Sequence, residues 1–405
     1  MESILQNRKN YQRNKILNII RTGHNISRND VKKISGYSMT TVIGSVNDLL
    51  AEHLILEEEC MDDRVGRRPV WLKINPDGGY CIGVEFNRNE MHCVIIDFLG
   101  KAIYHNGVKI AREERSKDSI ITKLEHMIQD GIDFLGRKKC RIIGIGIGVP
   151  GYSDKKTGTA FSYRYIEGWH DVPLREIIEK KFGIPCYLEN NINIMVYAYK
   201  WFIYNGKCED MLFVSVRTGA RVIPVINNRP IISNKGFSGE IGHLKLGNGS
   251  NLCECGQYGC INSEISEVAI VNKIMNGIRI GCFQDIWEKA NHNSDHITVQ
   301  LFVESALEGH KDSLTLEKHM ALIYGNMLGV LVNIFAPQRI ILFGTLNGLG
   351  DLLLNDIREV LKSYAIQDNL DNLHISYSQF GRDLGALGAG AYVIQSAFPF
   401  IEERV

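Results

Sequence analysis

The stretch Ile142-Ile143-Gly144-Ile145-Gly146-Ile147-Gly148-Val149-Pro150-Gly151 is the most regular apolar segment of the chain. An uncharged aliphatic run of this length predicts a buried strand, and the closing Pro-Gly pair predicts a loop at its carboxyl end. Such strands are typical of parallel sheets whose two faces are covered by helices. The stretch therefore predicts an α/β fold for the central part of the chain.

Strands and helices alternate on both sides of this stretch. Apolar segments bounded by turn residues predict strands at 80–86, 91–97, 185–188, 211–216, 222–226 and 340–343. Helices are expected at about 116–135 and 174–182, after 263, and from 384 onward. Because both halves open with strands and continue with helices, we expect a two-lobed α/β body with a cleft between the lobes. The first lobe would comprise 77–195, completed by the C-terminal helix 384–405, and the second lobe 196–383.

The first 76 residues have a different pattern. Apolar residues from Ile16 to Ile20 lie at helical spacing and predict a first helix. Ser27 is a typical N-cap for a short second helix over 28–34, and Gly36 ends that helix. A third helix is expected to start at Ser38. The segment therefore predicts three helices in succession, of which the middle one is short.

A hairpin follows these helices. Strands are expected at 54–56 and 70–74, and the turn between them contains Arg64, Arg67 and Arg68. Three helices followed by a basic hairpin is the order of a winged helix-turn-helix. We therefore predict that residues 1–76 form a domain that binds double-stranded operator DNA. The alternative is a small helical subdomain whose basic turn is only a solvated loop.

The third helix of this domain would lie in the major groove of DNA. Its candidate contacts are Ser38, Thr40, Thr41, Ser45 and Asn47. No lysine or arginine occurs between residues 38 and 52, so bidentate reading of guanine by this helix is not expected. The arginines at 64, 67 and 68 would reach phosphates or an adjacent minor groove.

Composition excludes several classes of protein. Lysine plus arginine and aspartate plus glutamate both total 46, which excludes a uniformly basic nucleic-acid coat and a disordered polyanion. No stretch reaches the roughly 18 apolar residues of a membrane span, and the N-terminus lacks the pattern of a signal peptide. Seven of the ten cysteines are scattered, as expected in a reducing compartment. We expect a cytoplasmic protein that does not enter a membrane.

The other three cysteines lie close together. Gly239-Glu240-Ile241-Gly242-His243 is followed by Cys253-Glu254-Cys255-Gly256-Gln257-Tyr258-Gly259-Cys260. Three thiolates and one imidazole match the tetrahedral preference of Zn²⁺, and the glycines let the loop fold back on itself. The predicted ligands are His243, Cys253, Cys255 and Cys260. Four protein ligands close the site, so we expect a structural zinc ion; the alternative is a coincidental group of buried cysteines.

A second polar group, Leu188-Glu189-Asn190-Asn191-Ile192-Asn193, follows an expected buried strand. Polar residues at the carboxyl end of such a strand lie where α/β sheets bind ligands. Carboxamides both donate and accept hydrogen bonds, which suits the hydroxyl groups of a sugar. An asparagine here would also suit a helix N-cap, and the two roles are compatible.

Together these motifs resemble the ROK family of repressors, open reading frames and sugar kinases. The Glu-x-Gly-His and Cys-x-Cys-Gly-x-x-Gly-Cys pair resembles the family signature, and the resemblance extends over nearly the whole chain. Other matching segments, in the family's order, are Val149-Pro150-Gly151, Gly168-Trp169, Glu189-Asn190, Pro337-Gln338-Arg339-Ile340 and Leu384-Gly385-Ala386-Leu387-Gly388-Ala389. The N-terminal domain, with Gly66-Arg67-Arg68-Pro69, resembles the xylose- and N-acetylglucosamine-type repressors. The resemblance implies a fold like the actin and hexokinase ATPases, a sugar in the cleft, and DNA binding switched by that sugar.

The resemblance also implies the residues that contact the sugar. Asn190, Glu240 and His243 match the family's contacts, and His243 would hold zinc as well. Asn191 and Asn262 stand where the family has an aspartate and a glutamate, and Tyr165 stands where it has an asparagine. Exchanging two carboxylates for amides removes charge-assisted hydrogen bonds, so the ligand would be unusual, weakly bound or absent. Glu264 lies two residues beyond Asn262 and offers a nearby carboxylate.

The kinase motifs of the family are altered. Where the kinases have Asp-x-Gly-Gly-Thr, this chain has Glu85-Phe86-Asn87-Arg88-Asn89, and the second phosphate loop reads Arg217-Thr218-Gly219-Ala220-Arg221. Two arginines could bind an anion there, but they replace the glycines of the family loop. Asn191 stands at the position of the family's catalytic aspartate, and its amide cannot accept a proton from a sugar hydroxyl. The Gly-Gly on the adenosine side is reduced to Phe343-Gly344-Thr345. Phosphoryl transfer is therefore not expected.

The leading hypothesis is a sugar-responsive transcriptional repressor that binds a pseudo-palindromic operator as a homodimer or homotetramer. Ligand binding would change lobe closure and thereby the spacing of the DNA-binding domains. One alternative is a sugar kinase with a degenerate ATP site and an appended DNA-binding domain. Another is a DNA-bound protein whose cleft senses nothing.

Overall fold

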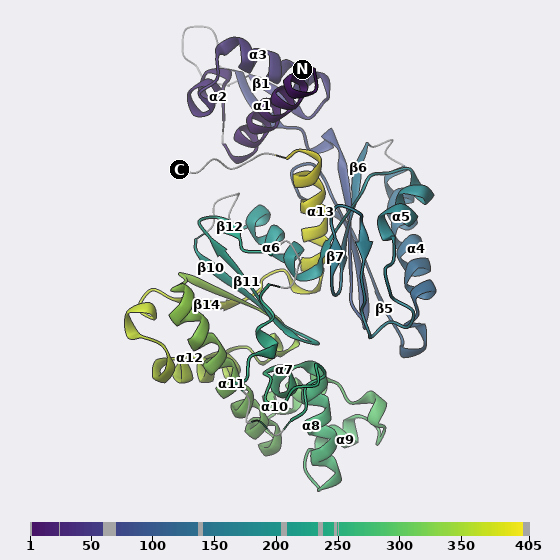
Figure 1. Ribbon diagram of the computed structural model, residues 1–405, viewed down its shortest axis with the longest axis vertical. Coiled ribbons are helices and arrows are strands. Elements are labelled where there is room, and N and C mark those ends of the chain that lie inside the picture. The colour runs from purple at the N-terminus through teal and green to yellow at the C-terminus, as the bar shows by residue number, and fades with distance from the viewer. Residues whose placement is uncertain are drawn as a thin grey trace. The chain divides into compact units, whose positions relative to one another are not determined.

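The computed structural model describes residues 2–23, 25–59, 70–136, 141–203, 209–233, 238–246, 249 and 251–399. The chain divides into two compact units, Met1–Gly206 with Phe380–Val405, and Lys207–Gln379. Each unit contains its own mixed sheet (Figure 1). The chain passes from the first unit to the second after residue 206 and returns after residue 379. These positions lie near the domain limits expected after 195 and after 383, which stay a prediction.

The first unit opens with helices α1 (Glu2–Thr22), α2 (Arg28–Ser35) and α3 (Met39–Ala51) and the antiparallel hairpin β1 (Ile55–Glu59) and β2 (Val70–Ile74). The sequence places the ends of α2. The Ser27 hydroxyl accepts a hydrogen bond from the Asp30 backbone while the Asp30 carboxylate accepts one from the Ser27 backbone, and Gly36 ends the helix at φ +72°. Buried aliphatic residues from all three helices and β2 form the core of this segment. The predicted order of a winged helix-turn-helix is confirmed.

A mixed sheet with strand order β5-β4-β3-β6-β9 follows. Its strands are β3 (Tyr80–Phe86), β4 (Glu90–Ile96), β5 (Ala102–Lys109), β6 (Ile142–Val149) and β9 (Cys186–Asn190). Its helices are α4 (Lys117–Gly136), α5 (Leu174–Phe182), α6 (Asn191–Phe202) and α13 (Leu384–Ala397), and a short hairpin comprises β7 (Ser153–Asp154) and β8 (Thr159–Ala160). Strands β3 to β5 form an antiparallel meander, whereas β6 and β9 run parallel to β3.

The alternating sequence of β6 explains how the sheet is covered. Ile145 and Ile147 pack in one core with α4 and α5. Gly144 and Gly146 face α13, and Gly148 faces Ile194 of α6. A Cβ on Gly146 would lie only 2.1 Å from the Ala389 carbonyl oxygen. A side chain at this position would push the helix away from the sheet. Figure 1 shows α13, in yellow, beside the sheet. The glycine-isoleucine pattern therefore gives one face to a hydrophobic core and the other to close helix packing.

The second unit repeats this arrangement with strand order β12-β11-β10-β13-β14. Its strands are β10 (Met211–Val216), β11 (Ala220–Ile226), β12 (Arg229–Pro230), β13 (Arg339–Gly344) and β14 (His374–Tyr377). Its helices are α7 (Asn262–Ile265), α8 (Glu267–Arg279), α9 (Gln284–Lys289), α10 (Val299–Leu307), α11 (Lys311–Phe335) and α12 (Asp351–Tyr364). Again an antiparallel meander is extended by two parallel strands. This repeated topology is the two-lobed α/β architecture that the sequence predicts, and it agrees with the actin- and hexokinase-like fold that the family resemblance implies.

The N-terminal helices share a hydrophobic core with the sheet of the first unit. Val94 and Ile96 of β4 and Val393 of α13 belong to the same buried cluster as the α1 and α3 side chains. The Arg21 guanidinium of α1 lies 4.1 Å from the centre of the Trp201 ring in α6. The predicted DNA-binding segment therefore packs directly on the first lobe.

Within the described residues no helix is both long and apolar enough to cross a membrane.

Helix α11 buries an unusual charge. In α11 the apolar buried face is interrupted by Glu317, which is fully buried and whose carboxylate oxygens have no hydrogen-bond partner in the described part of the chain. Burial and then the neighbouring charge of Asp356 raise the pKa of Glu317 to about 7, against an ordinary value of 4.5. Ionisation of Glu317 near neutral pH therefore costs free energy, because the buried carboxylate has no partner.

We expect Glu317→Gln to stabilise the protein at alkaline pH. Because the pKa of Glu317 is raised in the folded state, its protonated side chain contributes to the free energy of unfolding, and this contribution is fully present below pH 4.5. It is lost as the pH rises through about 7. The variant should exceed the wild type by about 2 kcal/mol in free energy of unfolding at pH 8.5, and by little at pH 5, since the amide remains without partners. Urea unfolding at both pH values measures the difference. Glu359→Gln, an exposed position on α12, is the control; equal pH dependence in the two variants would contradict the expectation.

Candidate functional site

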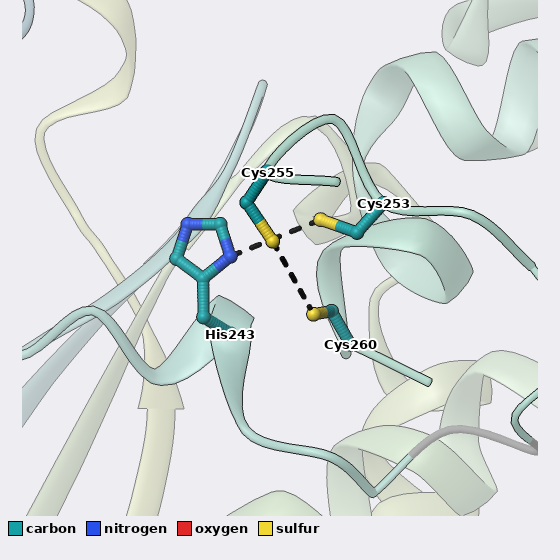
Figure 2. A group of neighbouring side chains, drawn as sticks. All are labelled: His243, Cys253, Cys255 and Cys260. Carbon is teal, nitrogen blue, oxygen red and sulfur yellow. Dashed lines mark hydrogen bonds between the residues drawn. The ribbon is translucent and has the colours of Figure 1, made fainter. Parts of the chain in front are cut away.

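The four predicted metal ligands converge in the second unit. His243 lies at the end of a short helical turn, Ile241–His243, and the three cysteines lie on the loop that precedes α7. Their ligand atoms all lie within 4.8 Å of one another. Cys253 Sγ is 3.8 Å from His243 Nδ1, and Cys255 Sγ is 3.7 Å from Cys260 Sγ. Figure 2 shows the four side chains pointing toward a common centre.

The loop is held in this shape by its own backbone. The Cys253 N–H donates to the Gln257 carbonyl at 2.8 Å, and the Gly256 N–H donates to the Cys253 carbonyl at 2.9 Å. Gly256 and Gly259 have φ values of +82° and +77°, in the left-handed region that favours glycine. The two glycines therefore turn the chain so that Cys260 returns beside Cys255.

The spacing of the sulfur atoms fits a tetrahedral metal ion. A Zn–S bond of about 2.3 Å in tetrahedral geometry places two sulfurs about 3.8 Å apart, close to the 3.7 Å between Cys255 and Cys260. All three cysteines are free rather than bridged. The backbone N–H of Gln257 lowers the pKa of Cys255, whereas burial raises that of Cys260 to about 12. A bound cation would favour the thiolate form of all three sulfurs.

A buried ion network joins the cysteine loop to the helices. Asn251 Nδ2 donates to Glu264 Oε1 at 2.9 Å, and Glu264 Oε2 lies 2.5 Å from Lys273 Nζ and 3.2 Å from His319 Nε2. Burial alone would raise the pKa of Glu264, but the hydrogen bonds from His319, Lys273 and Asn251 outweigh it and lower the pKa to about 2. Glu264 is thus a structural anchor, which the sequence did not reveal because His319 lies 55 residues away.

The predicted sugar contacts in the first unit lie at the start of α6. Asn190 is the N-cap: its Oδ1 accepts from the backbone of Ile192 at 2.9 Å, and its Nδ2 donates to the Gly151 carbonyl at 2.6 Å. Asn191 Nδ2 donates to Glu85 Oε1 at 3.1 Å. Both asparagines are buried. The helix-capping role of Asn190 is confirmed, and the sugar role of both residues stays a prediction.

The predicted contacts in the second unit, Glu240 and Asn262, lie beside β11. Glu240 Oε1 is 3.5 Å from Arg221 Nε, which also donates to the Ser238 carbonyl at 3.0 Å. Arg221 is 3% exposed and takes part in this buried contact. Asn262 Oδ1 accepts from the Ala220 backbone at 2.7 Å and fills the space against Gly242.

The structure revises the predicted DNA-contacting residues. Ser38 caps α3, and its hydroxyl accepts a hydrogen bond from the Thr41 backbone, while Thr40 and Asn47 are exposed on the helix. Ser45 is buried beside Val42, Val46 and Leu49, so its prediction as a base contact is wrong. Arg64, Arg67 and Arg68 lie outside the described residues.

A basic residue that the sequence did not reveal lies beside Asn47. Arg28, at the start of α2, pairs with Glu57 and donates to Asn47 Oδ1 at 3.2 Å. Ile43 and Gly44 are exposed on α3 between Thr40 and Asn47. Helical spacing distinguishes these exposed positions from the buried Ser45, because residues 42, 45, 46 and 49 share one face of the helix.

Comparison with known proteins extends over nearly the whole chain. The family model described as ROK family matches residues 81–396. The xylose repressor of Caldicellulosiruptor bescii is 30% identical over 381 residues, covering 93% of this chain and 94% of that protein. The DNA-binding transcriptional dual regulator NagC of Escherichia coli is 25% identical, covering 91% of this chain and 88% of that protein.

Solved structures show the same fold. A ROK family transcriptional regulator described as a homologue of the E. coli MLC protein superposes with a TM-score of 0.82 at 21% identity and covers 96% of both chains. A ROK family glucokinase from Streptomyces griseus, in complex with glucose and AMPPNP, superposes with a TM-score of 0.67 at 22% identity; it covers 78% of this chain and 100% of the kinase. With its signature motifs, its fold and these relatives in agreement, the chain belongs to the ROK family.

Proposed function

We propose that the chain is a transcriptional repressor of carbohydrate metabolism that binds operator DNA and responds to a sugar or sugar derivative. The observation that carries this proposal is the N-terminal winged helix, which precedes the family match at residue 81. A regulator structure covers 96% of the chain, whereas a kinase structure covers 78%. Relatives named as xylose and N-acetylglucosamine repressors align over at least nine-tenths of it. We also propose a homodimer or homotetramer, whose symmetry would match a pseudo-palindromic operator.

The DNA-reading surface would be the exposed face of α3. Ser38, Thr40, Thr41 and Asn47 supply hydroxyl and amide groups that can bind base edges or phosphates. Arg28 lies beside Asn47 and would add a phosphate contact. The sequence adds Arg64, Arg67 and Arg68 in the turn of the hairpin.

We expect Asn47→Ala to weaken operator binding by about 5- to 150-fold, because a base contact of this kind is worth about 1–3 kcal/mol. Footprinting on the DNA upstream of the chain's own gene, at moderate salt, measures the affinity. Asn276→Ala, an exposed asparagine on α8, is the matched control. Equal affinity of the two variants would remove α3 as the reading helix, and the absence of sequence-specific protection by the wild type would overturn the repressor function.

Phosphoryl transfer is not part of the proposed function. The position of the family's catalytic base is Asn191, whose amide donates to the buried Glu85 carboxylate and is therefore bound as a donor. An amide cannot accept the proton that a sugar hydroxyl must lose. A coupled assay with ATP and a panel of hexoses, pentoses and amino sugars tests this point, and turnover well above background would favour a kinase instead.

The proposed sugar contacts are Asn190, Asn191, Glu240, His243 and Asn262. Glu240 keeps about a third of its side chain exposed and therefore offers an accessible carboxylate. Zinc, held by His243 and the three cysteines, would be structural, because four protein ligands leave no open position. It would fix the loop beside Glu240 and Asn262, and it needs no part in any reaction.

Helix α6 supports coupling between sugar and DNA. It begins at Asn190 and Asn191, and Trp201 near its end stacks against Arg21 of α1. A shift of α6 on ligand binding would therefore reach the winged helix through packed side chains.

A further inference from the structure

A glycine lies in the middle of α3, the helix proposed to read the operator. Gly44 is the sixth of the thirteen residues of Met39–Ala51. A glycine inside a helix destabilises it relative to alanine, because glycine loses more backbone freedom on folding. The backbone does not require glycine here, since Gly44 is not among the glycines with positive φ, unlike Gly36, which ends α2 at φ +72°. Gly44 therefore costs stability without a conformational reason.

Packing does not require this glycine either. A Cβ on Gly44 would meet no atom within 4 Å beyond its own turn of the helix. The interior glycines of the other described helices differ, because a Cβ on each would lie 3.3 Å or less from a neighbouring atom. They are Gly131 in α4, Gly277 in α8, Gly325 and Gly329 in α11, and Gly385, Gly388 and Gly390 in α13. Those glycines make room for the fold, whereas Gly44 keeps open a space on the surface.

The residues around Gly44 form an exposed, uncharged face of α3. Thr40 lies one turn before Gly44 and Asn47 one turn after it, and both are exposed. Ile43, next to Gly44, is 42% exposed although it is a large apolar residue. The opposite face of the helix is buried. The exposed face therefore has bare backbone at its centre, bordered by one apolar side chain and two that form hydrogen bonds.

The charges around this face favour a polyanion as its partner. Residues 38–47 contain no acidic side chain, and the last turn of α2 carries two exposed lysines. Glu57 and Glu58 of the neighbouring β1 are already paired, with Arg28 and Lys73. The sequence places three further arginines in the turn of the hairpin. Together with the winged-helix order, this charge distribution identifies a DNA duplex as the partner of the face.

A helix without a side chain at the centre of its exposed face can lie deeper in the major groove. The groove is about 12 Å wide and an α-helix with its side chains is about 10–12 Å across, so the fit leaves little room. Thymine projects its 5-methyl group into this groove, where an apolar side chain can pack on it. Ile43 has such a side chain, beside the gap at Gly44. The two neighbouring residues thus supply the space and the apolar contact that thymine requires.

We propose that Gly44 is the point at which α3 approaches the base edges most closely, and that Ile43 packs against the methyl group of a thymine there. Thymine is then recognised by an apolar contact, in agreement with the absence of lysine and arginine between residues 38 and 52. The proposal rests on the proposed function, in which α3 reads the operator, and it specifies the base and the contact.

The first test fills the space at Gly44 in the full-length protein. Gly44→Ala should raise Tm by about 2 °C, because alanine is the better helix former, and yet weaken operator binding about tenfold. Gly44→Leu should weaken it about a hundredfold, because its side chain is larger. Affinity for an unrelated duplex should not change, since phosphate contacts carry that binding. Gly136→Ala, at the end of α4, also places its Cβ in open space and should leave operator affinity unchanged.

The second test removes only the thymine methyl group. Each thymine of the footprinted operator is replaced in turn by deoxyuridine. One position in each half-site should weaken wild-type binding about fourfold, which is the worth of one buried methyl group. Ile43→Ala should bind the normal operator more weakly and should not respond to this replacement, because the contact is already lost. Ile280→Ala, at an isoleucine that is 80% exposed just after α8, should respond like the wild type.

Four results would overturn this docking while the repressor function stands. They are equal operator affinity of Gly44→Leu and Gly136→Ala, a lower Tm of Gly44→Ala than of the wild type, equal loss of specific and unspecific DNA affinity, and the absence of any thymine methyl whose effect depends on Ile43. Weaker self-association of Gly44→Leu with unchanged DNA affinity would assign the face to a second copy of the chain, and the docking would again be wrong. A wild type without sequence-specific protection would overturn the repressor function itself, and the docking with it.

Discussion

Cys260→Ser is expected to abolish zinc binding and to cause a large loss of stability in the second unit. Metal binding at a Cys₃His site of this kind is coupled to folding and is worth on the order of 10 kcal/mol in isolated zinc-binding peptides. Cys260 immediately precedes the segment that enters α7, and His243 ends the turn that starts after Glu240. Without the ion, the turn that ends at His243 and the segment that begins at Cys260 are no longer joined through shared metal coordination. Thermal unfolding with metal analysis measures the effect.

The matched control is Cys282→Ser, a cysteine of the same unit outside the four-ligand cluster. It should retain one equivalent of zinc and lose little in Tm. A strong chelator should reproduce the effect of Cys260→Ser on the wild type. If the wild type contains no stoichiometric metal after purification with zinc, or if Cys260→Ser unfolds at the same temperature as Cys282→Ser, the structural role of the ion is wrong.

Features governed by near neighbours were predictable from the sequence. The ends of α2 follow from Ser27, Asp30 and Gly36, which lie within one ten-residue segment. The Cys-x-Cys and Gly-x-x-Gly-Cys spacing identifies the metal cluster for the same reason, since a short loop brings its own ligands together. The alternation of glycine and isoleucine in β6 predicts a buried strand because the side-chain period of a strand is two.

Features that depend on distant partners were not predictable. Ser45 is a separate case: its polar side chain suggested an exposed position, although helical spacing already places it on the buried face with Val42 and Leu49. Arg221 could be placed in an anion-binding loop by its spacing, but only the fold brings Glu240 and Ser238 to it. Arg88 in the β3–β4 turn and Arg112 and Arg115 before α4 come from two separate segments, and only the fold brings their charges together.

Glu264→Gln is expected to lower the free energy of unfolding by about 3 kcal/mol at neutral pH. A tenfold change in proton affinity is worth about 1.4 kcal/mol, so the lowering of the Glu264 pKa from 4.5 to about 2 corresponds to this value. The variant keeps the volume of the side chain but leaves the buried contact to Lys273 without its charge partner. Asn251 would also hold the cysteine loop less firmly, so zinc should be removed faster by a chelator.

The pH dependence separates this charge effect from a packing effect. Because the pKa of Glu264 is depressed in the folded state, its contribution is fully present above pH 4.5 and is lost as pH falls toward about 2. The stability difference between wild type and Glu264→Gln should therefore shrink between pH 5 and pH 3, whereas a packing defect would be independent of pH. Glu304→Gln, an exposed glutamate on α10, is the control and should show no such convergence. Urea unfolding at pH 7, 5, 4 and 3 measures the difference, and a constant gap across this range would mean that the ion network does not stabilise the fold through the charge on Glu264.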